Sequence, residues 1–276
     1  MSALGGKVCV ITGAGSGIGR ALALDLAGRG ARLALSDVDE AGLAQTAALV
    51  GPGAHTARLD VADRDAFVAY AEAVAGHFGV VHQVYNNAGI AFRRTVLESD
   101  WADYERVLGI NLWGVIHGTK ALLPHLIASG DGHVVNISSL NGIMAQPDMS
   151  HYCTAKFAVR GFTETLRTEL DRDGHPVKTT VVHPGGIKTN IASAAFARAK
   201  ADGLPVTPAD ERRVKLYNDK LLKMDPARAA KTIVDGVVAG RPRVMVGNDA
   251  KLLDGLVRLL PSLAPRLIVA GERRLG

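Results

Sequence analysis

Three polar residues, Ser139, Tyr152 and Lys156, are spaced so that together they could move a proton. Tyr152 and Lys156 lie four positions apart in SHYCTAK (150–156), and Ser139 precedes Tyr152 by 13 positions. Residues i and i+4 share one face of a helix, so the phenol and the ammonium can occupy one pocket. With a serine hydroxyl on its other side, the phenol becomes a plausible acid–base group. Taken alone, the Tyr–Lys pair would more often be a tyrosine beside a surface lysine.

The elements that must position these residues alternate along the chain. Short β-branched runs predict strands, and longer segments with helical periodicity lie between them. This alternation predicts a parallel sheet with helices on both faces, which is an α/β doubly wound fold. The predicted strands are 7–12, 31–37, 55–60, 81–86, 133–138, 177–182 and 243–247, and the clearest helices are 63–77, 101–127 and 151–172.

Length and composition favour one catalytic domain with a C-terminal extension. The chain has 276 residues, of which 47% are hydrophobic, and no Pro-, Gly- or Ser-rich linker divides it. We assign residues 1–250 to a single domain and 251–276 to the extension. Residues 190–225, which are Ala-rich and then charged, interrupt the alternation and are predicted to form a helical flap over the substrate.

Charge and cysteine content exclude several classes of protein. Residues 191–276 carry 16 Lys and Arg against 9 Asp and Glu, but no dense basic run predicts nucleic-acid binding. The two cysteines, Cys9 in a predicted strand and Cys153, form no zinc-binding pattern, so no metal is expected. No cleavable signal and no apolar run long enough to span a bilayer are apparent, and a cytoplasmic location is expected.

A glycine-rich turn follows the first predicted strand. In TGAGSGIG (12–19) the glycines at 13, 17 and 19 depart from the GxGxxG spacing. They nevertheless allow a tight strand-to-helix turn and a close approach of the backbone to a pyrophosphate at a helix N-terminus. The position of the turn, directly after the first strand of an alternating chain, predicts dinucleotide binding.

Asp37, at the end of the second strand, selects between the two nicotinamide dinucleotides. It follows Gly19 by 18 residues, where an acidic side chain hydrogen-bonds the adenosine ribose and repels a 2′-phosphate. Val38 and Ser16 stand where basic residues would accept that phosphate. The sequence therefore favours NAD over NADP, and the alternative role for Asp37 is a helix N-cap.

These motifs together resemble the classical short-chain dehydrogenase/reductase family over residues 5–190, with general similarity of topology to about 247. The resemblance implies a Rossmann-type fold, a catalytic tetrad of Asn111, Ser139, Tyr152 and Lys156, and assembly into homotetramers or homodimers through helices 101–127 and 151–172. The C-terminal tail departs from the family pattern. The expected cofactor-binding residues are Gly13, Ser16, Gly17, Ile18, Gly19, Asp37, Asp60, Val61, Asn87, Ala88, Gly89, Tyr152, Lys156, Pro184, Gly185, Ile187 and Thr189.

The tetrad implies an oxidoreductase that transfers a hydride between NAD(H) and a secondary alcohol or ketone, with Tyr152 as general acid/base. A nearby ammonium and the positive nicotinamide ring should both lower the pKa of the phenol. A hydrophobic substrate is expected because the candidate wall residues are mostly apolar. They are Phe92, Leu140, Ile143, Met144 and Gln146, with Ile90 and His151 as further candidates.

Two other functions stay open on the sequence alone. A regulatory protein could bind NAD(H) without turnover, although it would have no need of the Tyr–Lys pair. A peripheral membrane scaffold could use the tail, in which Leu252, Leu253, Leu256, Leu259 and Leu260 form an amphipathic stripe accompanied by basic residues and ended by Pro261. The tail could equally pack on its own or a neighbouring subunit, or cover the substrate cleft.

Overall fold

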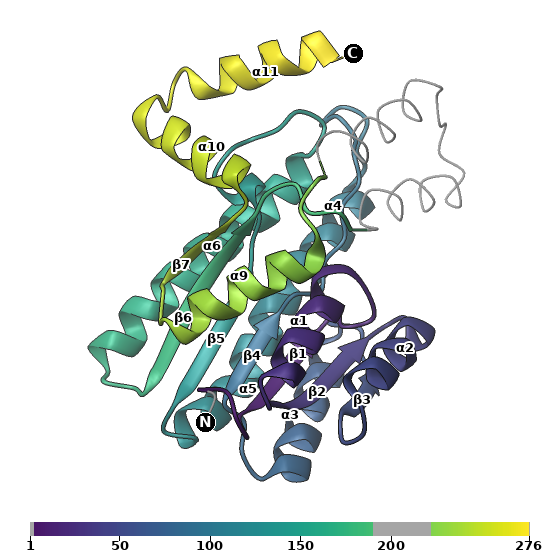
Figure 1. Cartoon of the computed structure of the whole chain (residues 1–276). Helices are drawn as coiled ribbons and strands as arrows, with labels where there is room; N and C mark the ends of the chain where they lie inside the picture. Colours follow the sequence, from purple (N-terminus) through teal and green to yellow (C-terminus); the bar gives the residue numbers. More distant parts are fainter. Residues whose placement is uncertain (1–2, 190–221, 276) are drawn as a thin grey trace.

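A seven-stranded parallel sheet with helices on both faces forms the body of the protein (Figure 1). The computed structural model describes residues 3–189 and 222–275. Strand order is β3-β2-β1-β4-β5-β6-β7, and every pairing is parallel. The strands are β1 Val8–Thr12, β2 Arg32–Asp37, β3 His55–Arg58, β4 Gln83–Asn86, β5 Gly132–Ile137, β6 Val177–Pro184 and β7 Arg243–Val246. The predicted doubly wound fold is confirmed.

The helices cover the two faces of the sheet in separate layers. Helices α1 and α9 pack on one face, and α3, α5 and α6 pack on the other (Figure 1). The described helices are α1 Gly17–Gly28, α2 Glu40–Val50, α3 Arg64–Phe78, α4 Trp101–Leu108, α5 Gly114–Ala128, α6 Ser150–Arg172, α9 Pro226–Val238, α10 Asn248–Leu259 and α11 Ala264–Leu275.

Alternate residues of β1, β2, β4, β5 and β6 supply the two cores. In β1, Cys9 and Ile11 face α1 and α9, whereas Val8 and Val10 face the layer of α3, α5 and α6. Burial on both faces explains why the strands are apolar without alternation. Cys9 is fully buried in β1, as its apolar context predicted.

The segment predicted as one helix, 101–127, is interrupted. Helix α4 ends at Leu108, a π-helical turn follows at Gly109–Trp113, and α5 begins at Gly114. Such π-turns are rare and are often associated with functional sites. This one carries Asn111.

The order of the strands reverses between β1 and β4, and this reversal locates the expected ligand site. In open α/β sheets, ligands bind beyond the carboxyl ends of the strands at such a switch point. The predicted flap, 190–225, lies outside the described residues except for 222–225, where Met224 pairs with Ile187. No described helix has the length and apolar character needed to cross a membrane.

Candidate active site

The turn between β1 and α1 has a backbone that only glycine allows. Gly13 and Gly17 have φ angles of 66° and 52°, in the left-handed region. A Cβ atom at Gly19 would overlap the carbonyl of Gly13. Asn87, beyond β4, fixes this turn because its Nδ2 donates to the carbonyls of Thr12 and Gly13, at 3.0 and 3.2 Å. The turn is therefore a preformed cradle at the N-terminus of α1.

Asp37 lies beside this cradle and is not a helix cap. Its carboxylate accepts hydrogen bonds from the backbone N–H of Gly15 at 2.7 Å and of Asp39 at 3.0 Å. The N-cap of α2 is Asp39, which accepts from the N–H of Gly42. Arg20, directly after the glycine turn, bonds to the carbonyls of Gly15 and Gly42 and to Thr46. It does not line the cleft that Asp37 lines.

Ser139, Tyr152 and Lys156 lie together at the carboxyl end of β5. Ser139 follows β5, and Tyr152 lies in the first turn of α6 with Lys156 one turn later. Lys156 is 3% exposed, and its Nζ donates to the carbonyl of Ile137 at 2.9 Å. Its own carbonyl accepts a 2.8 Å hydrogen bond from Ser138 Oγ, which ties α6 to the end of β5.

Burial controls the protonation of the two ionisable groups. It raises the pKa of Tyr152, while the hydrogen bond with Ser139 acts in the opposite direction. Burial also lowers the pKa of Lys156 to about 8. The sequence led us to expect a phenol made acidic by the ammonium. Lys156 is not among the groups that shift the pKa of Tyr152, and its Nζ lies 5.7 Å from the centre of the tyrosine ring.

Asn111 is held beside this group by the π-turn. Its side chain is fully buried, accepts from the N–H of Ile90 at 2.8 Å and donates to the carbonyl of Ile90 at 2.7 Å. A Cβ atom at Gly89 would lie 3.1 Å from Asn111 Oδ1 and 3.6 Å from Lys156 Nζ, so the amide and the ammonium flank the same glycine. Asn111 does not itself line the cleft.

A cleft of about 500 Å³ runs along the carboxyl ends of the strands and contains most of the predicted residues. Gly19 and Asn111 lie behind its surface. Residues that line it without having been predicted include Leu59, Asp103, Arg106 and Leu222. The predicted residues that line it are Gly13, Ser16, Gly17, Ile18, Asp37, Asp60, Val61, Asn87, Ala88, Gly89, Phe92, Ser139, Tyr152, Lys156, Pro184, Gly185, Ile187 and Thr189.

Most of the predicted substrate-binding residues lie away from this cleft. Leu140 and Ile143 are buried in the turn after Ser139, whereas Met144 and Gln146 are half-buried beyond it. His151 is fully buried and stacks against Phe92, with ring centroids 4.1 Å apart. Of the predicted set, only Phe92 lines the cleft, together with Ile90 as a further candidate. The short turn at 140–142 directs its apolar side chains into the protein.

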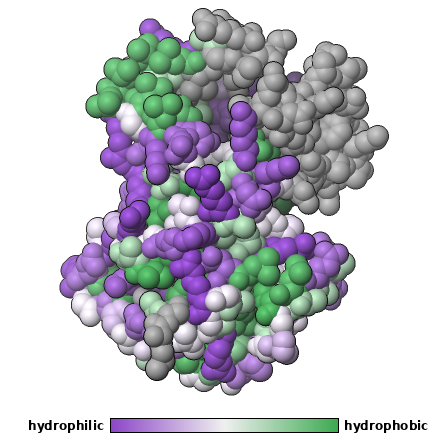
Figure 2. Space-filling view, viewed as in Figure 1, coloured by the Kyte–Doolittle hydropathy of each residue, from purple (hydrophilic) through white to green (hydrophobic). Residues whose placement is uncertain are grey.

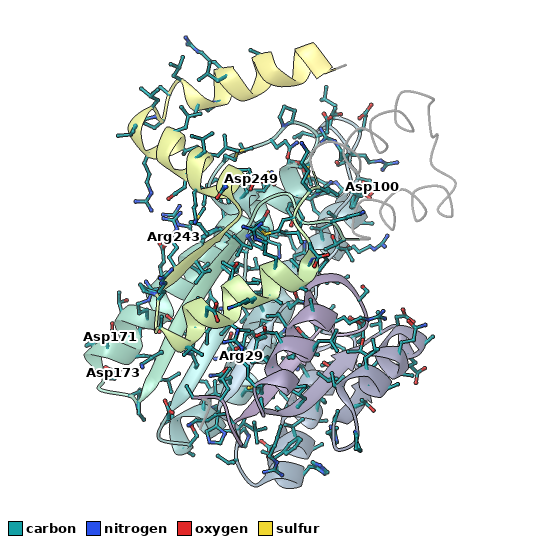
Figure 3. The ribbon with its side chains drawn as sticks, in the orientation of Figure 1. Arg29, Asp100, Asp171, Asp173, Arg243 and Asp249 are labelled. Carbon is teal, nitrogen blue, oxygen red and sulfur yellow. The ribbon has the colours of Figure 1, made fainter. Side chains whose placement is uncertain are left out.

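Two residues near the site were not predicted. His183, at the end of β6, donates from Nδ1 to the carbonyl of Ser139 at 2.8 Å. Asp249, in the first turn of α10, accepts from the N–H of Gly186 at 2.7 Å (Figure 3). Both follow the rule that residues at the carboxyl ends of strands surround the ligand site, and that rule could have identified them.

The chain matches the family model for short chain dehydrogenases over residues 7–200. It is 54% identical to "Putative oxidoreductase SadH" of Mycobacterium tuberculosis, over 98% of this chain and 97% of that protein. It is 28% identical to estradiol 17-beta-dehydrogenase 11 of Pongo abelii, over 93% and 80%. A short-chain dehydrogenase/reductase of Burkholderia phymatum, crystallised with NAD, superposes with a TM-score of 0.83 at 32% identity, over 94% and 96%. The chain therefore belongs to the short-chain dehydrogenase/reductase family of oxidoreductases.

Proposed function

We propose that the protein transfers a hydride between NAD(H) and a hydrophobic secondary alcohol or ketone, with Tyr152 as the general acid/base. The observation that carries the proposal is the convergence of Ser139, Tyr152 and Lys156 on one cleft with the glycine turn and Asp37. Proton transfer and dinucleotide binding thereby share a single site, as hydride transfer to a carbonyl carbon requires.

The residues of the cleft fit a dinucleotide. Side chains at Gly13 or Gly19 would collide with neighbouring backbone, so glycine at these positions is needed for the tight turn at the N-terminus of α1, where a pyrophosphate would bind. Asp37 and Val38 line the end of the cleft beside β2. Ile187 and Thr189 line it beyond β6 and would hold the nicotinamide end. The structure of the Burkholderia phymatum relative in complex with NAD supports a dinucleotide in this cleft.

NAD is favoured over NADP because of the charge beside the ribose site. Asp37 would repel a 2′-phosphate. Of the cleft-lining residues that the structure describes, only Arg106 and Lys156 are basic, and both come from helices distant in sequence from Asp37. Arg20 is occupied by the carbonyls of Gly15 and Gly42.

The bound nicotinamide would supply or accept the hydride. Tyr152 Oη would donate a proton to the carbonyl oxygen during reduction and accept one from the hydroxyl during oxidation. Ser139 Oγ would hydrogen-bond the same oxygen, and this bond would strengthen as negative charge develops. Lys156 Nζ would hold the ribose hydroxyls, and Asn111 would position a water that links Lys156 to solvent.

The burial of Tyr152 favours its acid role. Burial raises the pKa of the phenol, so the group carries its proton at neutral pH. For alcohol oxidation the phenol must become a better base, and the positive charge of oxidised nicotinamide would act in that direction.

An apolar substrate is supported by the end of the cleft near Tyr152. Ile90, Ala91, Phe92 and Ile110 line it, while Asp103 and Arg106 offer polar contacts. One relative is named estradiol 17-beta-dehydrogenase 11, and estradiol is a steroid alcohol. Bulky hydrophobic alcohols and ketones are therefore the first compounds to screen.

Assembly and location are parts of the same proposal. Exposed Trp113, the last residue of the π-turn before α5, and exposed Phe157 on α6 support a homo-oligomer formed through these helices. A cytoplasmic location is supported by two cysteines, Cys9 and Cys153, that are buried and unpaired.

A substrate screen with a matched pair of variants tests the proposal. Hydrophobic secondary alcohols are offered with NAD, and NADH absorbance is followed. Tyr152→Phe should lower turnover roughly 10²- to 10⁴-fold while NADH binding, measured by fluorescence, is retained. Tyr85→Phe, which removes a buried hydroxyl bonded to Gln83, is the control and should keep its activity. Full activity of Tyr152→Phe would refute the assignment, and NADH binding by the wild type without any turnover would favour a sensor.

A further inference from the structure

Helix α10 has apolar residues on two opposite sides. One side packs against β7 and the turn at 140–142, and includes buried Ala250. On the other side Leu252 and Leu259 are 74% and 81% exposed. These two leucines are seven residues apart and so form one row along the helix. The exposed leucines therefore form a separate apolar surface, which is not continuous with the buried side of the helix.

The exposed row continues beyond α10. Leu260 and Leu263, in the turn before α11, and Leu267 in α11 are also exposed. Figure 2 shows hydrophobic residues gathered where α10 turns into α11, and Figure 1 shows α11 lying away from the sheet. We call Leu252, Leu259, Leu260, Leu263 and Leu267 the tail patch. Isolated exposed leucines need no explanation, but a contiguous group marks an interaction surface.

Basic side chains accompany the tail patch. Lys251 and Arg258 are also seven residues apart, so they form a second exposed row beside the leucines, and Arg266 is exposed on α11. The carboxylates of this region are already bonded within the chain. Asp249 (labelled in Figure 3) accepts a hydrogen bond from the N–H of Gly186. Asp254 pairs with Arg243 at 2.9 Å and with Arg258 at 3.0 Å.

We propose that the tail patch binds an anionic lipid surface, with the leucines entering the interface and the basic row contacting headgroups. An exposed apolar row beside lysine and arginine is the pattern of a helix lying in a membrane interface. This inference goes beyond the proposed reaction and does not depend on it.

The charge around the tail patch favours an anionic lipid surface over a second copy of the chain as its binding partner. A symmetric contact through the tail patch would bring Lys251, Arg258 and Arg266 of both copies together, where like charges repel. A second group of exposed apolar residues consists of Val96, Leu97 and Trp101. In contrast to the tail patch, it lies among acidic residues, including Glu98 and Asp100. Its charge does not fit an anionic surface, and it supplies a control.

The test is co-sedimentation of the full-length protein with vesicles. Phosphatidylcholine vesicles with and without phosphatidylglycerol are compared at low and high salt. The wild type should sediment with the anionic vesicles, and less so at high salt. Leu252→Gln/Leu259→Gln and Lys251→Gln/Arg266→Gln should each lower the partition coefficient roughly tenfold or more.

Matched controls change the same residue types elsewhere on the surface. Leu49 and Leu97 are 60% and 98% exposed, so Leu49→Gln/Leu97→Gln removes similar apolar area away from the tail. Lys178→Gln/Arg172→Gln removes one exposed lysine on β6 and one exposed arginine on α6, which matches the charge lost in the tail variant. Both controls should bind vesicles like the wild type, and all variants should retain wild-type circular dichroism.

Two results would overturn the proposal. One is wild-type protein that does not bind anionic vesicles. In that case, a smaller assembly of Leu252→Gln/Leu259→Gln by light scattering would assign the tail patch to a second copy of the chain. The other result is equal loss of vesicle binding in the tail and control variants.

Discussion

The Asp249 carboxylate accepts a 2.7 Å hydrogen bond from the backbone N–H of Gly186, and so connects the first turn of α10 to the loop after β6. The other side of this loop is also held. Lys188 donates its N–H to the carbonyl of Met224, and Met224 donates to the carbonyl of Gly186, at 2.8 and 3.1 Å. Ile187, between these contacts, lines the cleft. Asp249 thus positions part of the proposed nicotinamide site from outside the cleft.

Asp249→Ala should weaken NAD(H) binding. Loss of a charge-assisted hydrogen bond costs about 1.5–3 kcal/mol, and part of this should reach the cofactor loop, so we expect roughly a tenfold increase in Kd. Asp249→Asn keeps a side-chain oxygen that can accept from Gly186 and should bind nearly as the wild type does. Calorimetric titration with NADH measures both. Identical Kd values for Asp249→Ala and the wild type would show that the loop needs no such support.

Asp37→Asn should reduce the preference for NAD over NADP. The substitution removes the charge but leaves an oxygen to accept from the N–H of Gly15, so the glycine turn should stay in place. We expect the ratio of the NADP and NAD dissociation constants to fall roughly tenfold, because a 2′-phosphate no longer meets a like charge.

The control for this experiment is Asp39→Asn. Asp39 lies two residues away, caps α2 and does not line the cleft, so its loss of charge should leave the ratio unchanged. Equal shifts in the two variants would indicate a general effect of surface charge. Tighter binding of NADPH than NADH by the wild type would contradict the proposed cofactor.

The fold could be predicted because β-branched runs and helical periodicity are local signals. All seven strands are parallel, and every strand end lies within two residues of the prediction. The relation of Ser139 to Tyr152 and Lys156 was also predictable, since a strand end and an i, i+4 spacing fix it.

The features that could not be predicted from the sequence depend on tertiary packing. Nothing local marks the π-turn that places Asn111, because its side chain bonds to Ile90, 21 residues away. The wall residues Leu140 and Ile143 are apolar, but their type does not say whether they face a ligand or the core. Asp249 reaches the site only because β7 is the last strand of the sheet and α10 returns beside β6.

His183 provides a pH-dependent prediction, because it is buried and contacts the backbone of Ser139. Its Nδ1 must carry a proton to donate to the Ser139 carbonyl at 2.8 Å, so the neutral ring has a bare Nε2. That Nε2 is buried and meets no hydrogen-bond partner among the described residues. Burial lowers the pKa of His183 to about 4, since a charged ring would lose its hydration there.

The sign of the effect on stability follows from this shift. Between pH 6.5 and about 4 the unfolded chain binds a proton at His183 that the folded protein does not bind, so the free energy of unfolding falls as the pH falls. His183 alone should contribute a loss of roughly 2 kcal/mol between pH 7 and 5. Burial also lowers the pKa of His133 to about 4, so His133 adds to this loss of stability.

His183→Asn isolates the contribution of this one ring. Asparagine can still donate from its amide to the Ser139 carbonyl but does not titrate, so the variant should lose less stability than the wild type between pH 7 and 5. Urea unfolding at the two pH values measures the difference. His175→Asn, at an exposed histidine, should lose as much as the wild type. If His183→Asn and the wild type lost the same stability between pH 7 and 5, protonation of the buried ring would cost nothing. That result would contradict the prediction.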